Sequence, residues 1–246
     1  MSAYYDSYDY HSYWVGRDYE HCAEKIAIES ILSNLGEFNH LIEIGAGYGR
    51  LTKIYEKYAK KVTISDPSKQ LISIAKKTIK GRKFFFEVGD LSYMAQKHKN
   101  KYDLVIMVRV LHHIDNIENA IKNLSTITRK GGYLLLEYAN KLHFKSICRE
   151  IANGNLNFAY DMSPKLVGKK QKNCIPFLNY HPKIVYETLQ KYKYKILTKR
   201  SVSNIRNSTI KKYVPLNLML ILEKLLQSPF AKLHFGPSIF VLAQKS

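Results

Sequence analysis

The stretch Glu43-Ile44-Gly45-Ala46-Gly47-Tyr48-Gly49 decides the predicted fold of this chain. An apolar run, His40 to Ile44, leads into it and indicates a buried strand. Apolar residues at helical spacing follow from Leu51 to Tyr58 and indicate a helix. Glycines at such a junction let the backbone turn tightly and let a ligand approach the main chain, and the start of the helix offers unbonded N–H groups. The stretch therefore predicts a ligand site between a strand and a helix.

On both sides of this stretch, apolar runs alternate with segments of helical periodicity. Helices are predicted from Glu20 to Leu35, around Leu71 to Ala75 and from Ile117 to Thr128. Further strands are predicted at Val62–Asp66, Phe84–Asp90, Asp103–Val108 and Tyr133–Ala139. Strands that are apolar on both faces and alternate with helices predict a parallel sheet covered by helices on each side, an α/β fold.

The pattern changes after Asn140. An irregular region (140–180) precedes a helix from His181 to Tyr192 and a strand from Tyr194 to Val202, and a second insertion (203–236) precedes a last strand from Ser238 to Gln244. The two late strands predict a hairpin at the sheet edge. The chain of 246 residues fits one domain (1–246) with an aromatic N-terminal arm over residues 1–20.

Asp66 ends the second predicted strand, 19 residues after Gly47. A carboxylate there can accept hydrogen bonds from both hydroxyls of a ribose, and the sequence Ser65-Asp66-Pro67-Ser68 is also typical of a turn. Dinucleotide-binding chains share this layout, but they place Gly or Ala three residues after the second glycine. Arg50 stands there in this chain, which argues against a dinucleotide.

Five segments in this order resemble class I S-adenosylmethionine-dependent methyltransferases of the Rossmann-like kind. They are the glycine stretch, Asp66, Gly89-Asp90-Leu91, Val108 to Ile114 (VRVLHHI) and Gly131 to Tyr138. The resemblance is strongest to a small-molecule branch with a "VLHH" segment, and it implies a seven-stranded sheet whose last strand is antiparallel. It also implies S-adenosylmethionine as cofactor and S-adenosylhomocysteine as product. The residues that it places at the cofactor are Arg17, Glu43, Gly45, Ala46, Gly47, Gly49, Asp66, Pro67, Asp90, Leu91, Val108 and Arg109.

Within that resemblance, Glu43 is expected at the methionine amino group, Arg17 at its carboxylate and Asp90 at the adenine amino group. His113 and His112 are the candidate catalytic bases, because an imidazole can take a proton near neutral pH. Tyr138 and Tyr160 are weaker candidates. Aromatic residues of the arm, among them Tyr13, Trp14 and Tyr19, are expected either to wall the acceptor pocket or to pack on the sheet edge.

The methyl acceptor is expected to be a small or lipid-like molecule. Nucleic acid is the alternative because the formal net charge is +19, although 31 of 39 basic residues are Lys and no base-reading motif follows the fourth strand. A non-catalytic protein that binds S-adenosylmethionine is a third reading. The apolar helix from Leu216 to Leu226 is predicted as a cap on the core, with contact to a hydrophobic substrate or a membrane surface as the alternative.

Other classes are expected to be absent. The three cysteines are scattered, so no disulfide framework is predicted and a cytoplasmic location fits. No signal peptide, transmembrane segment or metal-ligand spacing is found in the sequence.

Overall fold

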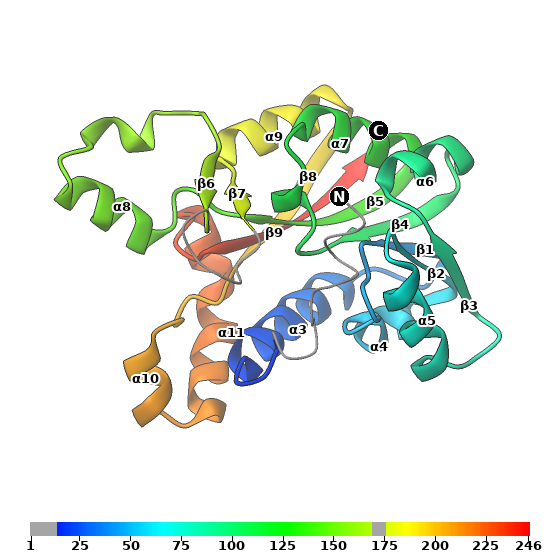
Figure 1. Cartoon of the computed structure of the whole chain (residues 1–246), viewed down its shortest axis with the longest axis horizontal. Helices are drawn as coiled ribbons and strands as arrows, with labels where there is room; N and C mark the ends of the chain where they lie inside the picture. Colours follow the sequence, from blue (N-terminus) through cyan, green and yellow to red (C-terminus); the bar gives the residue numbers. More distant parts are fainter. Residues whose placement is uncertain (1–13, 169–175) are drawn as a thin grey trace.

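A seven-stranded sheet forms the centre of the computed structural model, which describes residues 14–168 and 176–246 (Figure 1). The strand order is β3-β2-β1-β4-β5-β9-β8. Neighbours from β3 to β5 are parallel, whereas β9 lies antiparallel between β5 and β8. The strands are β1 (Phe38–Ile44), β2 (Ala59–Asp66), β3 (Phe84–Val88), β4 (Tyr102–Met107), β5 (Thr128–Ala139), β8 (Tyr194–Val202) and β9 (Ser238–Lys245). The predicted α/β fold with an antiparallel last strand is confirmed.

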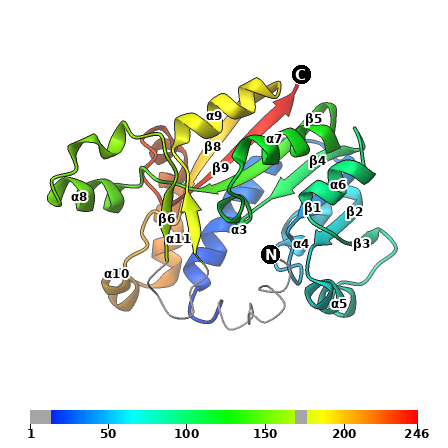
Figure 2. The same ribbon diagram turned by 45° about the horizontal axis from the view of Figure 1, so that its top comes forward.

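Helices cover both faces of the sheet (Figure 2). One face carries α3 (Asp18–Leu32), α4 (Thr52–Tyr55), α5 (Lys69–Thr78) and α11 (Leu216–Lys232). The other carries α6 (Leu91–Lys97), α7 (Ile117–Ile127) and α9 (Pro182–Lys191). Two helices lie beyond these layers, α8 (Phe144–Ala152) and α10 (Ser208–Tyr213).

The two-faced burial of the central strands explains their apolar runs. In β4, Leu104 and Ile106 belong to the core under α3, whereas Val105 and Met107 belong to the core under α7. Successive side chains of a strand point to opposite faces, so a strand covered on both sides needs apolar residues at every position.

Three local predictions differ from the structure. The helix after the glycines is only four residues, followed by a 3-10 turn, η1 (Glu56–Tyr58), because β2 already begins at Ala59. The late apolar helix is longer than expected and runs through Pro229 to Lys232. The irregular region contains α8, a 3-10 turn η3 (Leu156–Ala159) and a two-stranded ribbon of β6 (Lys165–Val167) and β7 (Phe177–Asn179).

Candidate functional site

The glycine loop leaves the carboxyl end of β1 and adopts a conformation that suits glycine. Gly45, Gly47 and Gly49 have φ angles of 69°, 59° and 83°, in the left-handed region that side chains disfavour. A Cβ at Gly45 would lie 2.3 Å from Val110 Cγ2, and the backbone N–H of Ala46 donates to the Ser65 carbonyl at 2.9 Å. The loop is thus held close to the ends of both β2 and β4.

Asp66 joins the ends of three parallel strands. Its Oδ2 accepts the Gly47 N–H at 2.8 Å and its Oδ1 accepts the Ser68 N–H at 2.8 Å. Its backbone carbonyl accepts the N–H of Gly89, which follows β3, at 3.0 Å. Asp66 therefore forms the turn that its sequence indicates and also stands beside the glycine loop, where a ribose is expected.

Glu43 is a buried carboxyl group at the end of β1. Its side chain is 3% exposed, and Thr52 Oγ1 donates to its Oε2 at 3.3 Å. Burial raises the pKa of Glu43 to about 8, so the group is mostly protonated at neutral pH. A buried acidic residue whose pKa is raised this far is typical of a functional site, and a positively charged ligand group would favour its ionised form.

A second buried carboxylate, Glu24 of α3, pairs with two arginines, one directly after the glycine loop and one after β4. Its Oε2 lies 2.6 Å from Arg50 NH2 and its Oε1 lies 2.8 Å from Arg109 NH1. The Arg50 guanidinium stacks at 3.5 Å from the centre of the Trp14 ring, and Arg109 lies 5.0 Å from it. Despite burial, the two arginines hold the pKa of Glu24 below its ordinary value. The arm residue Trp14 thus reaches the site through Arg50 and Arg109.

The backbone of Arg109 turns sharply after β4. Its φ is 61°, and its N–H donates at 2.7 Å to Oε2 of Glu137, a buried residue of β5. Ser238 Oγ donates to the other oxygen of Glu137 at 2.6 Å. This anchorage sets the direction of the segment that carries the two histidines.

The remaining predicted cofactor residues lie along the same strand ends. Asp90 is exposed and caps α6, where its Oδ1 accepts the Tyr93 N–H at 2.8 Å, and Leu91 is 7% exposed beside it. Val108 is buried directly after β4, and Pro67 follows Asp66. Arg17 stands at the N-cap of α3, where its N–H donates to the Trp14 carbonyl at 3.1 Å.

His112 and His113 form a 3-10 turn (η2, Leu111–His113) after β4. Their ring centroids are 4.1 Å apart, and His112 also contacts Phe177 at 5.5 Å. Burial lowers the pKa of His113 to about 4 and the pKa of His112 well below its ordinary value. His112 Nδ1 is buried without a hydrogen-bond partner among the described residues. Both rings are therefore neutral at pH 7 and able to accept a proton, although as weak bases.

The two tyrosine candidates lie in different surroundings. Tyr138 is fully buried and donates to Tyr186 Oη at 3.0 Å, which also lies 3.2 Å from His234 Nε2. Burial raises the pKa of Tyr138 well above its ordinary value. Tyr160 is 79% exposed. Tyr138 therefore fits a packing role better than proton transfer.

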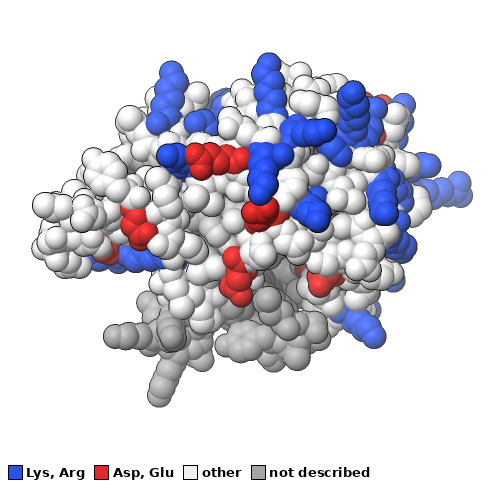
Figure 3. Space-filling model, turned by 90° about the horizontal axis from the view of Figure 1, so that it is seen from above, with Lys and Arg blue, Asp and Glu red and all other residues white. Residues whose placement is uncertain are grey.

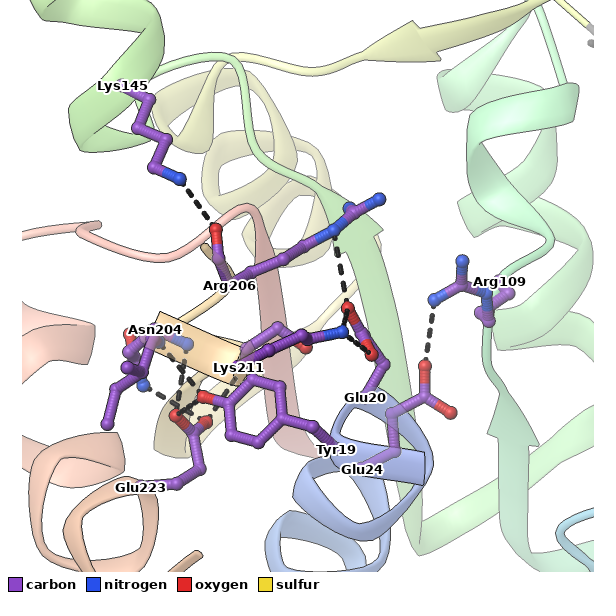
Figure 4. Close-up of polar contacts among 11 residues, drawn as sticks. Tyr19, Glu20, Glu24, Arg109, Lys145, Asn204, Arg206, Lys211 and Glu223 are labelled. Carbon is purple, nitrogen blue, oxygen red and sulfur yellow. Dashed lines mark hydrogen bonds and ion pairs between the residues drawn. The ribbon is translucent and has the colours of Figure 1, made fainter. Parts of the chain in front are cut away.

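The two described aromatic residues of the arm lie in different surroundings. Trp14 lies at the site, whereas Tyr19 is 2% exposed and donates its hydroxyl to Glu223 Oε2 of α11 at 2.5 Å (Figure 4). Tyr19 thus packs between α3 and α11 and does not wall a pocket. Tyr13 and the earlier aromatic residues fall outside the described part of the chain.

Sequence reasoning missed Glu24 and Arg50 as site residues. The signal for Glu24 was present, because it occupies a position on the apolar stripe of α3 between Ala23 and Ala27. A carboxylate on a core-facing stripe requires a buried partner. In the sequence, Arg50 stands out only as a departure from the dinucleotide pattern.

Basic residues are spread over the face of the molecule that Figure 3 shows. Figure 3, viewed from the side on which α7 and α9 lie, shows Lys and Arg scattered among a few carboxylates. Within residues 14–168 and 176–246, no set of three His, Cys, Asp or Glu side chains is placed to hold a metal ion. None of the helices in those two ranges has the length and apolar character that crossing a bilayer requires.

Comparisons with known proteins agree with this geometry. A family model described as a methyltransferase domain matches residues 15–178. The chain is 24% identical over 128 residues to the ubiquinone biosynthesis O-methyltransferase of Coxiella burnetii, which covers 51% of this chain and 53% of that protein. It is 25% identical over 114 residues to the demethylmenaquinone methyltransferase of Leptospira interrogans, covering 44% and 46%. The chain thus spans about half the length of these curated relatives.

A solved structure extends the likeness to the whole fold. The 1,6-didemethyltoxoflavin-N1-methyltransferase of Burkholderia thailandensis superimposes with a TM-score of 0.61 at 15% identity. The superposition covers 100% of this chain and 86% of that one.

Proposed function

We propose that this chain, which belongs to the methyltransferase domain family, transfers a methyl group from S-adenosylmethionine to a small lipophilic acceptor. The observation that carries the proposal is the juxtaposition at the carboxyl ends of β1 and β2. There a glycine loop, the buried acid Glu43 and the strand-end carboxylate Asp66 lie together. The carboxyl ends of parallel strands are the general ligand-binding edge of such sheets.

The residues present fit the cofactor. Glu43 would hold the methionine amino group, since an ammonium ion favours the ionised form of a buried carboxyl. Asp66 would hold the ribose, Asp90 would face the adenine, and Arg17 would pair with the methionine carboxylate. When bound, S-adenosylmethionine supplies an electrophilic methyl group on a sulfonium ion.

The protein itself would align the acceptor with the methyl group, exclude water and accept the proton that the acceptor loses. Trp14 is stacked on Arg50 and lies near Arg109, and it would cover the cofactor site at the carboxyl ends of the strands. As an acceptor hydroxyl forms its new bond to carbon, its proton would pass to a neutral imidazole, either His113 or Nδ1 of His112. A buried Nδ1 without a described partner suits that role.

A quinone-type acceptor is the class that the relatives favour. The two named relatives belong to ubiquinone biosynthesis and to demethylmenaquinone methylation. Transfer to a nucleic acid gains no support, since neither relative acts on one by name and Lys and Arg are scattered on the face that Figure 3 shows. An RNA-binding face would gather its arginines and aromatic residues.

The test incubates the protein with methyl-labelled S-adenosylmethionine and, in separate reactions, with a prenylated catechol, with demethylmenaquinol and with total RNA. We expect label in the organic phase with a quinol and none in RNA. Label that remains aqueous and disappears after ribonuclease treatment would refute the small acceptor. S-adenosylhomocysteine bound without any transfer would indicate a binding protein.

The matched variant is Asp66→Asn, which keeps the size of the side chain and removes its charge. Charged hydrogen bonds contribute about 1.5–3 kcal/mol, so its affinity for S-adenosylhomocysteine should fall about tenfold or more. A melting curve shows whether the loop contacts to Gly47 and Ser68 survive. Unchanged binding by a folded Asp66→Asn would place the ribose elsewhere.

A further inference from the structure

The long helix α11 turns two polar side chains toward the core and a row of apolar side chains toward the solvent. The side chains that pack on α3 and β8 are Met219, Glu223, Gln227 and Ala231, which repeat every four residues and are at most 2% exposed. A helix on the surface of a globular domain ordinarily turns its apolar stripe toward the core. The apolar cap that the sequence predicts is therefore only partly right, because the leucines do not form the packed face.

The two inward polar side chains, Glu223 and Gln227, hold the helix in place through hydrogen bonds. Glu223 accepts hydrogen bonds from the Tyr19 hydroxyl, the Ser203 N–H at 2.8 Å and the Asn204 N–H at 3.0 Å (Figure 4). Gln227 donates to the Ala23 carbonyl at 2.9 Å. These contacts hold α11 on α3 and on the segment after β8, and they leave its opposite side to the solvent.

That opposite side is a continuous apolar stripe, which we call the outer face of α11. It consists of Leu218, Ile221, Leu222 and Leu225, which are 49%, 58%, 41% and 66% exposed. Their spacing of three and four residues places them in one row along the helix. Tyr213, just before the helix, is 73% exposed and adds a ring with one polar tip.

The charges around the outer face have one sign. Lys212, Lys224 and Lys232 are exposed near it. Glu223 is the only acidic residue between positions 203 and 246, and it is buried. Lys211 of α10 is paired with an acidic residue, because its Nζ lies 2.6 Å from Oε1 of Glu20 on α3 (Figure 4).

From this pattern we infer that α10 and the outer face of α11 bind an anionic membrane surface, with the apolar stripe in the headgroup region and the lysines at the lipid phosphates. Apolar residues on one side and basic residues at the flanks are the two components of interfacial binding. A second copy of the chain is the poorer partner. A two-fold contact through this face would bring together two patches that both carry positive charge, and like charges repel.

The inference goes beyond the proposed methyl transfer, and its geometry suits a lipophilic acceptor. Tyr19 and Glu20, which hold α11 and α10, belong to the first turn of α3, directly after Trp14 and Arg17. A membrane on the outer face would therefore lie across α11 from the start of α3, which follows the segment that carries Trp14.

The test is flotation of the purified protein with vesicles of phosphatidylcholine alone and of phosphatidylcholine with a quarter of phosphatidylglycerol. We expect stronger binding to the anionic vesicles. Ile221→Glu and Leu225→Glu should each weaken it at least about tenfold, because a charge enters the apolar layer. Lys212→Glu and Lys224→Glu should each weaken it about fivefold or more, and only on anionic vesicles.

The matched control is Ile74→Glu on α5, a residue 39% exposed on a helix that also carries Lys76 and Lys77. It should bind vesicles as the wild type does. Wild-type protein that stays unbound, or Ile221→Glu that floats unchanged, would overturn the inference. So would a dimer in light scattering that Ile221→Glu dissociates. Binding of S-adenosylhomocysteine, measured on the same samples, tests the proposed function separately.

Discussion

Replacing Glu43 by Gln should weaken cofactor binding and stabilise the protein at the same time. The pKa of the buried carboxyl is about 8 without ligand, yet its role requires the ionised form opposite an ammonium group. With that pKa, about 1% of the protein is ionised at pH 6 and about 9% at pH 7. Affinity for S-adenosylhomocysteine should therefore rise about ninefold between pH 6 and pH 7.

The effect on folding has the opposite sign. The folded carboxyl binds its proton more tightly than the unfolded one, whose ordinary pKa is 4.5. The stability that this group contributes is full below pH 4.5 and is lost as the pH rises toward 8. At pH 7, which is 2.5 pH units above 4.5, the loss amounts to roughly 3 kcal/mol at 1.36 kcal/mol for each pH unit. Glu43→Gln cannot ionise and escapes this loss.

The assay is isothermal titration with S-adenosylhomocysteine at several pH values between 6 and 7, together with melting curves. The wild type should show the ninefold rise, and Glu43→Gln should bind weakly with no dependence on pH. The melting temperature of Glu43→Gln should exceed that of the wild type by several degrees at pH 7 and by less at pH 5. A flat wild-type affinity, or a Gln variant that binds as tightly as the wild type, would refute the assignment of Glu43 to the amino group.

Two further predictions concern the loop and the histidines. Gly45→Ala should destabilise the fold by about 1–3 kcal/mol, because φ is 69° there and the new Cβ would lie 2.3 Å from Val110 Cγ2; Gly36→Ala, with no atom within 4 Å of its Cβ, should be nearly neutral in the same chemical denaturation. His112→Ala and His113→Ala should both keep cofactor affinity. Turnover should fall about a hundredfold in one of the two variants, and that variant identifies the histidine that accepts the proton. Full turnover by both histidine variants would remove imidazole from the mechanism.

The sequence alone predicted the architecture because the governing signals are local. Apolar runs such as Asp103–Val108 match the central strand β4, and the strand predicted at Tyr194–Val202 matches β8 in both bounds. The glycine loop was also predictable, since a backbone with positive φ at Gly45, Gly47 and Gly49 calls for residues without a side chain. The cofactor class followed from five such segments in a fixed order.

What the tertiary structure decided is pairing between distant side chains. The sequence does not show that Glu24 meets Arg50 and Arg109, 26 and 85 positions away, or that Tyr19 meets Glu223 across 204 positions. It showed the leucines of α11 but not the side they face, because Glu223 and Gln227 find their partners only once α3 and β8 are in place. Periodicity reports which residues share a face, whereas the fold decides which face is covered.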